Sequence, residues 1–437
     1  MGQIAEGVLV LALMFALLGS GMWIFMALML TGILSLLLIH GFPLERVGVI
    51  ATKIIYRSSS TWELAAVPMF IWVGEMMFRT DIADRLFKGL SPWLEPLPGR
   101  LYHTNIMGSV LFGALCGSSA ATTATVGRIT SAELSRRGYD DGLALGSLAG
   151  AGTLGLLIPP SIMLVIYGVL AEVSIARLFM AGVIPGLVVA GTYSLYIIVV
   201  CFLKPNLVPA VLDAATWRDR FWALANILPV ATLIVVVLGS IYSGIATPSE
   251  AAGIGVAGTL IYCFVTKQMN WQVFKDSLRG AVRVSTMVCS LLFASALLSS
   301  ALGYMHIPRD LAQYIAGLNL SPYTLIFILT IFFILLGGPL DGISIMVMTL
   351  PLTAPLVQNA GFDLIWYGVF LALMAELAVI SPPVGFNLNV LQSISGRSMG
   401  FIARASIPFF VLMCFCVALF TIFPELVLWL PRQMSNR

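Results

Sequence analysis

Long apolar stretches, separated by short polar or charged segments, make up most of this chain. Eleven of them cover residues 4–40, 62–78, 104–127, 142–172, 178–203, 222–243, 250–266, 285–303, 323–357, 363–394 and 405–430. A helix that crosses the hydrocarbon core of a bilayer needs about 20 mostly apolar residues. The pattern therefore predicts an all-α polytopic membrane protein with about ten or more crossings and almost no soluble domain.

Composition supports this fold class. Of the 437 residues, 59% are hydrophobic and 10% are charged, whereas about 25% are charged in a typical soluble domain. The N-terminal sequence MGQIAEGVLVLAL has an acidic residue before its apolar run and no basic leader, so we interpret it as a retained first helix. The six cysteines show no metal-type spacing and are interpreted as packing residues. The net charge of +3 says little about partners, and we expect no nucleic acid among them.

Two pairs of adjacent prolines interrupt apolar stretches, in LIPPSIM at residues 157–163 and in ISPPVGF at residues 380–386. Proline removes a backbone donor and clashes with the preceding turn, so each pair predicts a broken helix at membrane depth. Non-helical backbone at that depth is tolerated where it lines a cavity or is buried in protein. The breaks are therefore candidate binding sites.

The two breaks mark an internal repeat. Aligning Pro159 with Pro382, 223 residues later, also superposes residues 138–140 on 361–363 and Pro185 on Pro408. The chain therefore divides into a first half, residues 1–214, and a second half, residues 222–437, joined by LDAATWRDR.

Charge sets the orientation of the two halves. The basic segments 204–220 and 267–283 are separated by two spans, so both are expected on the cytoplasmic side. Counting from them gives the halves opposite topology, an arrangement typical of secondary transporters, although the basic arm at 46–57 then lies outside. Residues 104–127 would form a re-entrant hairpin from the cytoplasmic side, and residues 323–357 one from the outside.

The hairpin tips and the helix breaks carry the candidate chemistry. The tips read CGSSAATT at 116–123 and GGPLDGIS at 337–344. Hydroxyl and carbonyl oxygens at such places suit a small hard cation, and the N-termini of half-helices attract an anion. Small residues and prolines also serve plain helix packing in membranes, so this alternative stays open. Asp341 and Glu376 favour function because carboxylates in apolar runs are expensive, although Glu376 could simply bond an exposed backbone group near the second break.

Across essentially its whole length the sequence resembles the large membrane subunit of the tripartite ATP-independent periplasmic (TRAP) transporters. The resemblance is carried by FGALCGSSAATTATVG with RRGYD, by AGTLGLLIPPSIMLVIYGVLAEVSIARLFMAGVIPG, and by LDGISIMVMTLPLTAPLV with AELAVISPPVGFNLNVLQSISG. It implies a multi-pass protein of the bacterial inner membrane, an elevator-type transporter driven by sodium. Its partners would be a small four-helix membrane subunit and a periplasmic binding protein that delivers a carboxylate such as a dicarboxylate, a sugar acid or sialic acid.

The resemblance also implies the site residues. Sodium, with no transition metal, would be bound by Gly117, Ser118, Ser119, Gly152 and Thr153 in the first half, and by Asp341, Gly342, Ser381, Pro382 and Gly385 in the second. We expect Ser118, Ser119, Thr122, Pro159, Ser161 and Asn387 to hold the substrate anion. The chain departs from the family pattern near the second break, where Met374 replaces an Asn and Ala378 replaces a Gly.

We expect a static scaffold of residues 1–61 and 222–284 and a mobile transport domain of residues 62–214, with the cytoplasmic-side hairpin, and 285–437, with the periplasmic-side hairpin. An intramembrane enzyme is not expected, because the three histidines share no spacing and no HExxH motif occurs. Inverted halves with paired breaks favour alternating access over a channel. The alternative function is a conventional ion-coupled anion carrier that works without a binding protein.

Overall fold

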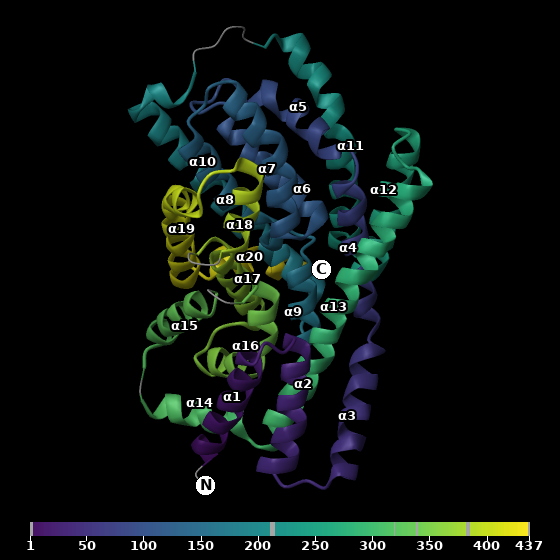
Figure 1. Ribbon diagram of the computed structural model, residues 1–437, viewed down its shortest axis with the longest axis vertical. Coiled ribbons are helices and arrows are strands. Elements are labelled where there is room, and N and C mark those ends of the chain that lie inside the picture. The colour runs from purple at the N-terminus through teal and green to yellow at the C-terminus, as the bar shows by residue number, and fades with distance from the viewer. Residues whose placement is uncertain (1–2, 210–214, 319, 338–339, 382–384, 436–437) are drawn as a thin grey trace.

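The computed structural model describes the whole chain except residues 1–2, 210–214, 319, 338–339, 382–384 and 436–437. Within the described ranges the fold is entirely helical (Figure 1). The first half contains α1 (Gln3–Gly19), α2 (Ile24–Leu34) with a π-helical turn (Ser35–Ile39), α3 (Leu44–Ser59), a 3-10 turn (Trp62–Ala65), α4 (Ala66–Phe78), α5 (Ile82–Leu94), α6 (Tyr102–Cys116), α7 (Ser119–Arg136), α8 (Asp141–Leu157), α9 (Ile162–Leu170), α10 (Ile175–Leu203) and a 3-10 turn (Pro205–Leu207).

The second half contains α11 (Trp217–Tyr242), α12 (Pro248–Val265), α13 (Trp271–Tyr304), α14 (Ile307–Gly317), α15 (Pro322–Leu336), α16 (Gly342–Asn359), α17 (Leu364–Ile380), α18 (Phe386–Ser395), α19 (Met399–Ile422) and α20 (Glu425–Ser435). Its helix bounds repeat those of the first half at a spacing of 223 residues. Helices α7 and α16 have 18 residues each and begin at Ser119 and Gly342, and α8 and α17 have 17 residues each and begin at Asp141 and Leu364.

The halves differ after their second helices. In the first half, α3 and α4 are separate helices joined through the 3-10 turn Trp62–Ala65. In the second half, α13 runs through the corresponding region as one helix of 34 residues. The domain boundary that the sequence predicts after residue 284 therefore lies inside a continuous helix.

Two helices form the centre of the bundle. Every residue of α8 from Leu143 to Leu157 is buried, and so is every residue of α17 from Ile365 to Ile380. A helix that is apolar on all sides is either packed inside a protein or faces lipid, and the burial of these two helices shows that they are packed inside the protein. Helix α8 is in contact with α6, α7, α17 and α19, and residues 158–161 are buried, so the first break lies inside the protein.

Six helices of the described residues are long and apolar enough to cross a membrane: α10, α11, α12, α13, α16 and α19. A seventh span results if α8 and α9, which are bent by 41° at Ile158–Ser161, are counted together. About ten or more crossings would require some of the shorter apolar helices, α1, α2, α15 and α17, to cross as well.

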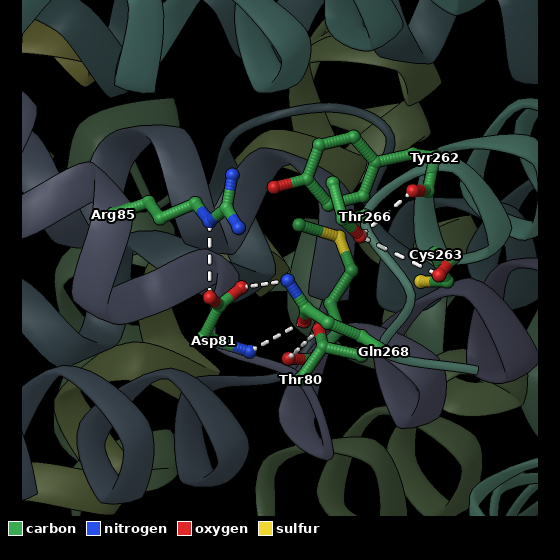
Figure 2. A network of polar contacts seen from close by, with 8 residues as sticks. Thr80, Asp81, Arg85, Tyr262, Cys263, Thr266 and Gln268 are labelled. Carbon is green, nitrogen blue, oxygen red and sulfur yellow. Dashed lines mark hydrogen bonds and ion pairs between the residues drawn. The ribbon is translucent and has the colours of Figure 1, made fainter. Parts of the chain in front are cut away.

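A polar network joins the turn between α4 and α5 to the turn between α12 and α13 (Figure 2). The Gln268 side chain accepts from the backbone N–H of Asp81 at 2.9 Å and donates to its carboxylate. The other carboxylate oxygen accepts from Arg85 Nε at 3.0 Å. The network joins segments that lie 187 residues apart and holds Asp81, the residue before α5, against the turn between α12 and α13.

Candidate functional site

The first hairpin turns at Gly117 and Ser118. Gly117 ends α6 in the left-handed conformation, with φ 62° and ψ 18°, which a glycine adopts without strain. Ser118 caps α7 by accepting from the N–H of Ala121 at 3.4 Å. A Cβ atom added at Gly117 would lie 3.1 Å from Ile162 N and 3.2 Å from Pro160 O. The hairpin tip therefore lies directly against the break between α8 and α9.

The first break is short and fully buried. Residues 158–161, including Pro159, connect the end of α8 to the start of α9. The Ser161 hydroxyl donates to the carbonyl of Leu156 and accepts from the N–H of Leu164 at 3.4 Å, so it caps both half-helices. Gly117, two residues before α7, lies against Ile162 at the start of α9, and the N–H groups of a helix N-terminus favour an anion.

A carboxyl group from the second half reaches into this region. Glu376 of α17 is completely buried. The Ser119 hydroxyl lies 3.0 Å from its Oε1 and 2.9 Å from its Oε2, and Oε1 also accepts from the N–H of Leu156 at 2.9 Å. The same hydroxyl lies 3.2 Å from the carbonyl oxygen of Thr153. Ser119, Thr153 and Glu376 thus form one polar cluster.

Glycines let α8 approach the hairpin closely. A Cβ atom at Gly152 would lie 1.8 Å from Thr123 Oγ1 and 3.4 Å from Asn387 Nδ2. A Cβ atom at Gly155 would lie 2.8 Å from Thr122 Oγ1. Any side chain at these two positions would collide with α7, so glycine is required for the observed packing.

Polar atoms without partners gather around Gly152 and Gly155. The side-chain oxygens of Thr122 and Thr123, and both side-chain polar atoms of Asn387, are buried and have no hydrogen-bond partner among the described residues. Buried polar groups are normally hydrogen-bonded, so such atoms call for an explanation. Hydroxyl and amide groups fit both predicted ligands, because they offer oxygens to sodium and donors to an anion.

The second hairpin also packs against its broken helix. A Cβ atom at Gly342 would lie 2.4 Å from the Cβ of Ala375, and one at Gly337 would lie 2.5 Å from the Cβ of Ala378. Asp341 caps α16 by accepting from the backbone and side chain of Ser344, and it is exposed. The Asp341 carboxylate therefore stands at the N-terminus of α16, at the tip of the second hairpin.

The second break holds the remaining predicted residues. The Ser381 hydroxyl donates to the carbonyl of Ala378 at 3.1 Å, and the N–H of Gly385 donates to the carbonyl of Ser381 at 3.0 Å. Pro382 lies outside the described residues. Met374 is buried in α17, where the resemblance placed an Asn.

The structure brings together Gly117, Ser118, Ser119, Thr122, Gly152, Thr153, Pro159, Ser161 and Asn387 around the first break, whereas Asp341, Gly342, Ser381 and Gly385 lie at the second hairpin and break. Sequence reasoning missed Thr123 as a site residue and did not include Glu376 in its ligand sets. Thr123 could have been found because it stands in the same serine- and threonine-rich tip. Glu376 could not be assigned to Ser119, which lies 257 residues away.

Comparisons with known proteins give a family and a fold. Residues 11–426 match the family model described as "Tripartite ATP-independent periplasmic transporter, DctM component". The chain is 30% identical over 411 residues to the C4-dicarboxylate TRAP transporter large permease protein DctM of Pseudomonas aeruginosa. The aligned region covers 93% of this chain and 94% of that protein. It is 28% identical over 374 residues to the sialic acid TRAP transporter large permease protein SiaM of Vibrio cholerae, covering 84% and 86%. The fold is similar to that of Neisseria gonorrhoeae MtrF, from a class of antimetabolite efflux pumps, with a TM-score of 0.56, 12% identity and coverage of 88% and 85%.

Proposed function

Because the chain belongs to the DctM component family of the tripartite ATP-independent periplasmic transporters, we propose that it imports a small organic acid anion in symport with sodium. Family membership makes it a transporter permease subunit of the bacterial inner membrane and not an enzyme. The coupling ion, the anion and the movement are the proposed part.

One observation carries the proposal: buried polar atoms without partners meet a broken helix beside a hairpin tip. Thr123 and Asn387 present such atoms beside Gly152, Thr122 presents one beside Gly155, and Ser119 lies in the same hairpin. Sodium bound to the hydroxyls and backbone carbonyls of this region would supply positive charge next to the anion. The N-termini of α7 and α9 and the amide of Asn387 would orient that anion by hydrogen bonds.

The repeat supports an elevator-type movement of a transport domain against a scaffold. Figure 1 shows α6 and α7 in the upper part of the molecule and α15 and α16 in the lower part. It also shows the α8–α9 pair running downward and the α17–α18 pair running upward. Inverted repeats with re-entrant hairpins from opposite sides would produce this arrangement. We propose that both hairpins and both broken helices move together.

The substrate class and the partners follow from the relatives. Two of the relatives are named for C4-dicarboxylates and sialic acid, and both compounds carry carboxylates. We propose an organic acid anion of the dicarboxylate, sugar acid or sialic acid class. A periplasmic binding protein would deliver it, and a small four-helix membrane subunit would pack on the scaffold. The exposed aromatic side chains of Trp217, Phe221 and Trp222 on α11 offer a surface for lipid or for that subunit.

Uptake by proteoliposomes tests the proposal. The vesicles hold this chain with its small subunit, and labelled carboxylates are offered with or without the cognate binding protein and an inward sodium gradient. We expect uptake only when both are present. Uptake without the binding protein would establish the alternative, a conventional ion-coupled carrier, and uptake that ignores sodium would refute the coupling.

A further inference from the structure

We propose that Glu376 is a positioning residue that holds the tip of the α6–α7 hairpin in register with the broken end of α8. The inference deepens the proposed function, because it concerns the same ion and anion site. Glu376 belongs to the second half, and its hydrogen-bond partners Ser119 and Leu156 belong to the first. The geometry of the first break is therefore set partly by a residue from the other half of the chain.

The contact is made by hydrogen bonds. None of the ion pairs between described residues includes Glu376, and its carboxyl group is completely buried. One oxygen accepts from Leu156 N at 2.9 Å, and the Ser119 hydroxyl lies within 3.0 Å of both oxygens. A buried carboxyl group that bonds two separate segments favours a fixed distance between them, because moving either segment away costs a buried hydrogen bond.

Both contacts touch residues of the predicted sodium site. Ser119 is itself a predicted ligand, and Glu376 orients its hydroxyl. In a regular α-helix the N–H of residue 156 donates to the carbonyl of residue 152. Glu376 offers this N–H a second acceptor, which makes the Gly152 carbonyl more available to another partner. One carboxyl group thus arranges two of the oxygens proposed to bind sodium.

Helix α17 also connects this contact to the second hairpin. Ala375, which directly precedes Glu376, packs against Gly342 at the start of α16 so closely that a Cβ atom there would come within 2.4 Å. A shift of α16 is therefore passed to α17 by direct contact and reaches Ser119 through Glu376. Continuous packing of this kind allows binding at one hairpin to change affinity at the other.

Three substitutions separate position from charge. Glu376→Gln keeps the length of the side chain, with an oxygen to accept from Leu156 and an amide to donate to Ser119. Glu376→Asp keeps the carboxyl group but is one methylene shorter, so it cannot span both contacts. Glu376→Ala removes them. The matched control is Tyr367→Phe, which removes another buried hydrogen bond of α17, from the Tyr367 hydroxyl to Thr353 Oγ1 at 2.5 Å.

Two readouts are measured for the chain with its small subunit and the binding protein. The first is the sodium concentration for half-maximal uptake into proteoliposomes. The second is the rise in thermal unfolding temperature of the detergent-solubilised protein when sodium chloride replaces choline chloride, which reports binding without transport. We expect Glu376→Asp and Glu376→Ala to raise the half-maximal sodium concentration by about 10- to 100-fold, as loss of a residue that orients a metal ligand does. Glu376→Gln and Tyr367→Phe should stay close to the wild type.

The outcomes are distinguishable. If Glu376→Gln fails as Glu376→Asp does, the charge of the side chain matters. If Glu376→Asp matches the wild type, the length of the side chain does not matter. Either result refutes the positioning role. If Glu376→Ala does not fold, the comparison of Gln with Asp still decides. Wild-type uptake without sodium dependence would refute the proposed function together with this role. Sodium-dependent wild-type uptake with no difference between Glu376→Asp and Tyr367→Phe would refute the positioning role alone.

Discussion

Replacing Gly152 by alanine measures how tightly α8 packs against the first hairpin. The added Cβ atom would lie 1.8 Å from Thr123 Oγ1 and 3.0 Å from Thr123 Cβ. Ordinary contact begins at 3.4 Å, so the methyl group is about 1.6 Å too close to the hydroxyl oxygen. A rotation of the threonine side chain relieves the contact with its oxygen but not that with its Cβ, so α7 and α8 have to move apart.

The magnitude follows from two opposing effects. Overpacking a close-packed interior costs about 1–3 kcal/mol. Alanine favours a helix over glycine by up to about 1 kcal/mol, which offsets part of this cost. We therefore expect Gly152→Ala to lower the free energy of unfolding by about 1–2 kcal/mol. Its effect on transport should be larger, because a displacement of about 1 Å in a binding site can cost about 100-fold.

The assay compares thermal unfolding and uptake for Gly152→Ala and Gly191→Ala. Gly191 is a suitable control because it lies in α10 and a Cβ atom there meets nothing within 4 Å. We expect the control to be as stable as the wild type or slightly more stable. The double variant Gly152→Ala with Thr123→Ala should regain part of the lost stability. If Gly152→Ala is as stable as the control and transports normally, the close approach of α8 to α7 is wrong.

Three further outcomes are expected. Ser161→Ala should lower stability by about 1 kcal/mol, since it removes the cap of α9, and a free energy of unfolding equal to that of the wild type would contradict the capping role. The Arg136 side chain, hydrogen-bonded to Glu133, holds the pKa of that carboxyl group below its ordinary value of 4.5. The stability gained is therefore present above that value and is lost as pH falls through the lower folded-state pKa, so Glu133→Gln should reduce the loss of stability on acidification. Gln268→Glu should destabilise the protein more than Gln268→Ala, because it sets a second carboxylate against Asp81, and the reverse order in thermal unfolding would argue against the bidentate contact.

Much of the local structure follows from sequence patterns. The proline pair at 159–160 predicts the break that separates α8 from α9, and Gly117 with Ser118 predicts the turn between α6 and α7. The spacing of 223 residues predicts where α16 and α17 begin. These features depend on the conformational preferences of a few residues, which act wherever the residue stands.

The features that sequence could not supply are contacts between distant segments. The sequence left open whether Glu376 has a functional role or bonds backbone near its own break at Ser381, and in the structure it bonds the N–H of Leu156 at the other break. Asp341 was expected to bind an ion, and it caps α16 with Ser344, so its role as a sodium ligand stays a prediction. A carboxylate in an apolar run signals an unusual environment, but only packing decides which donors surround it.

The uninterrupted α13 makes the two halves mechanically unequal. Its 34 residues form a rod about 50 Å long, whereas α3 and α4 meet at a 3-10 turn that a few backbone torsions can bend. Helices α3 and α13 lie in contact, so the continuous helix α13 supports α3 along part of its length. If the core moves against these helices, we expect bending to concentrate at Trp62–Ala65, while α13 stays straight. The two repeats therefore build a jointed pair of helices in the first half and one continuous helix in the second.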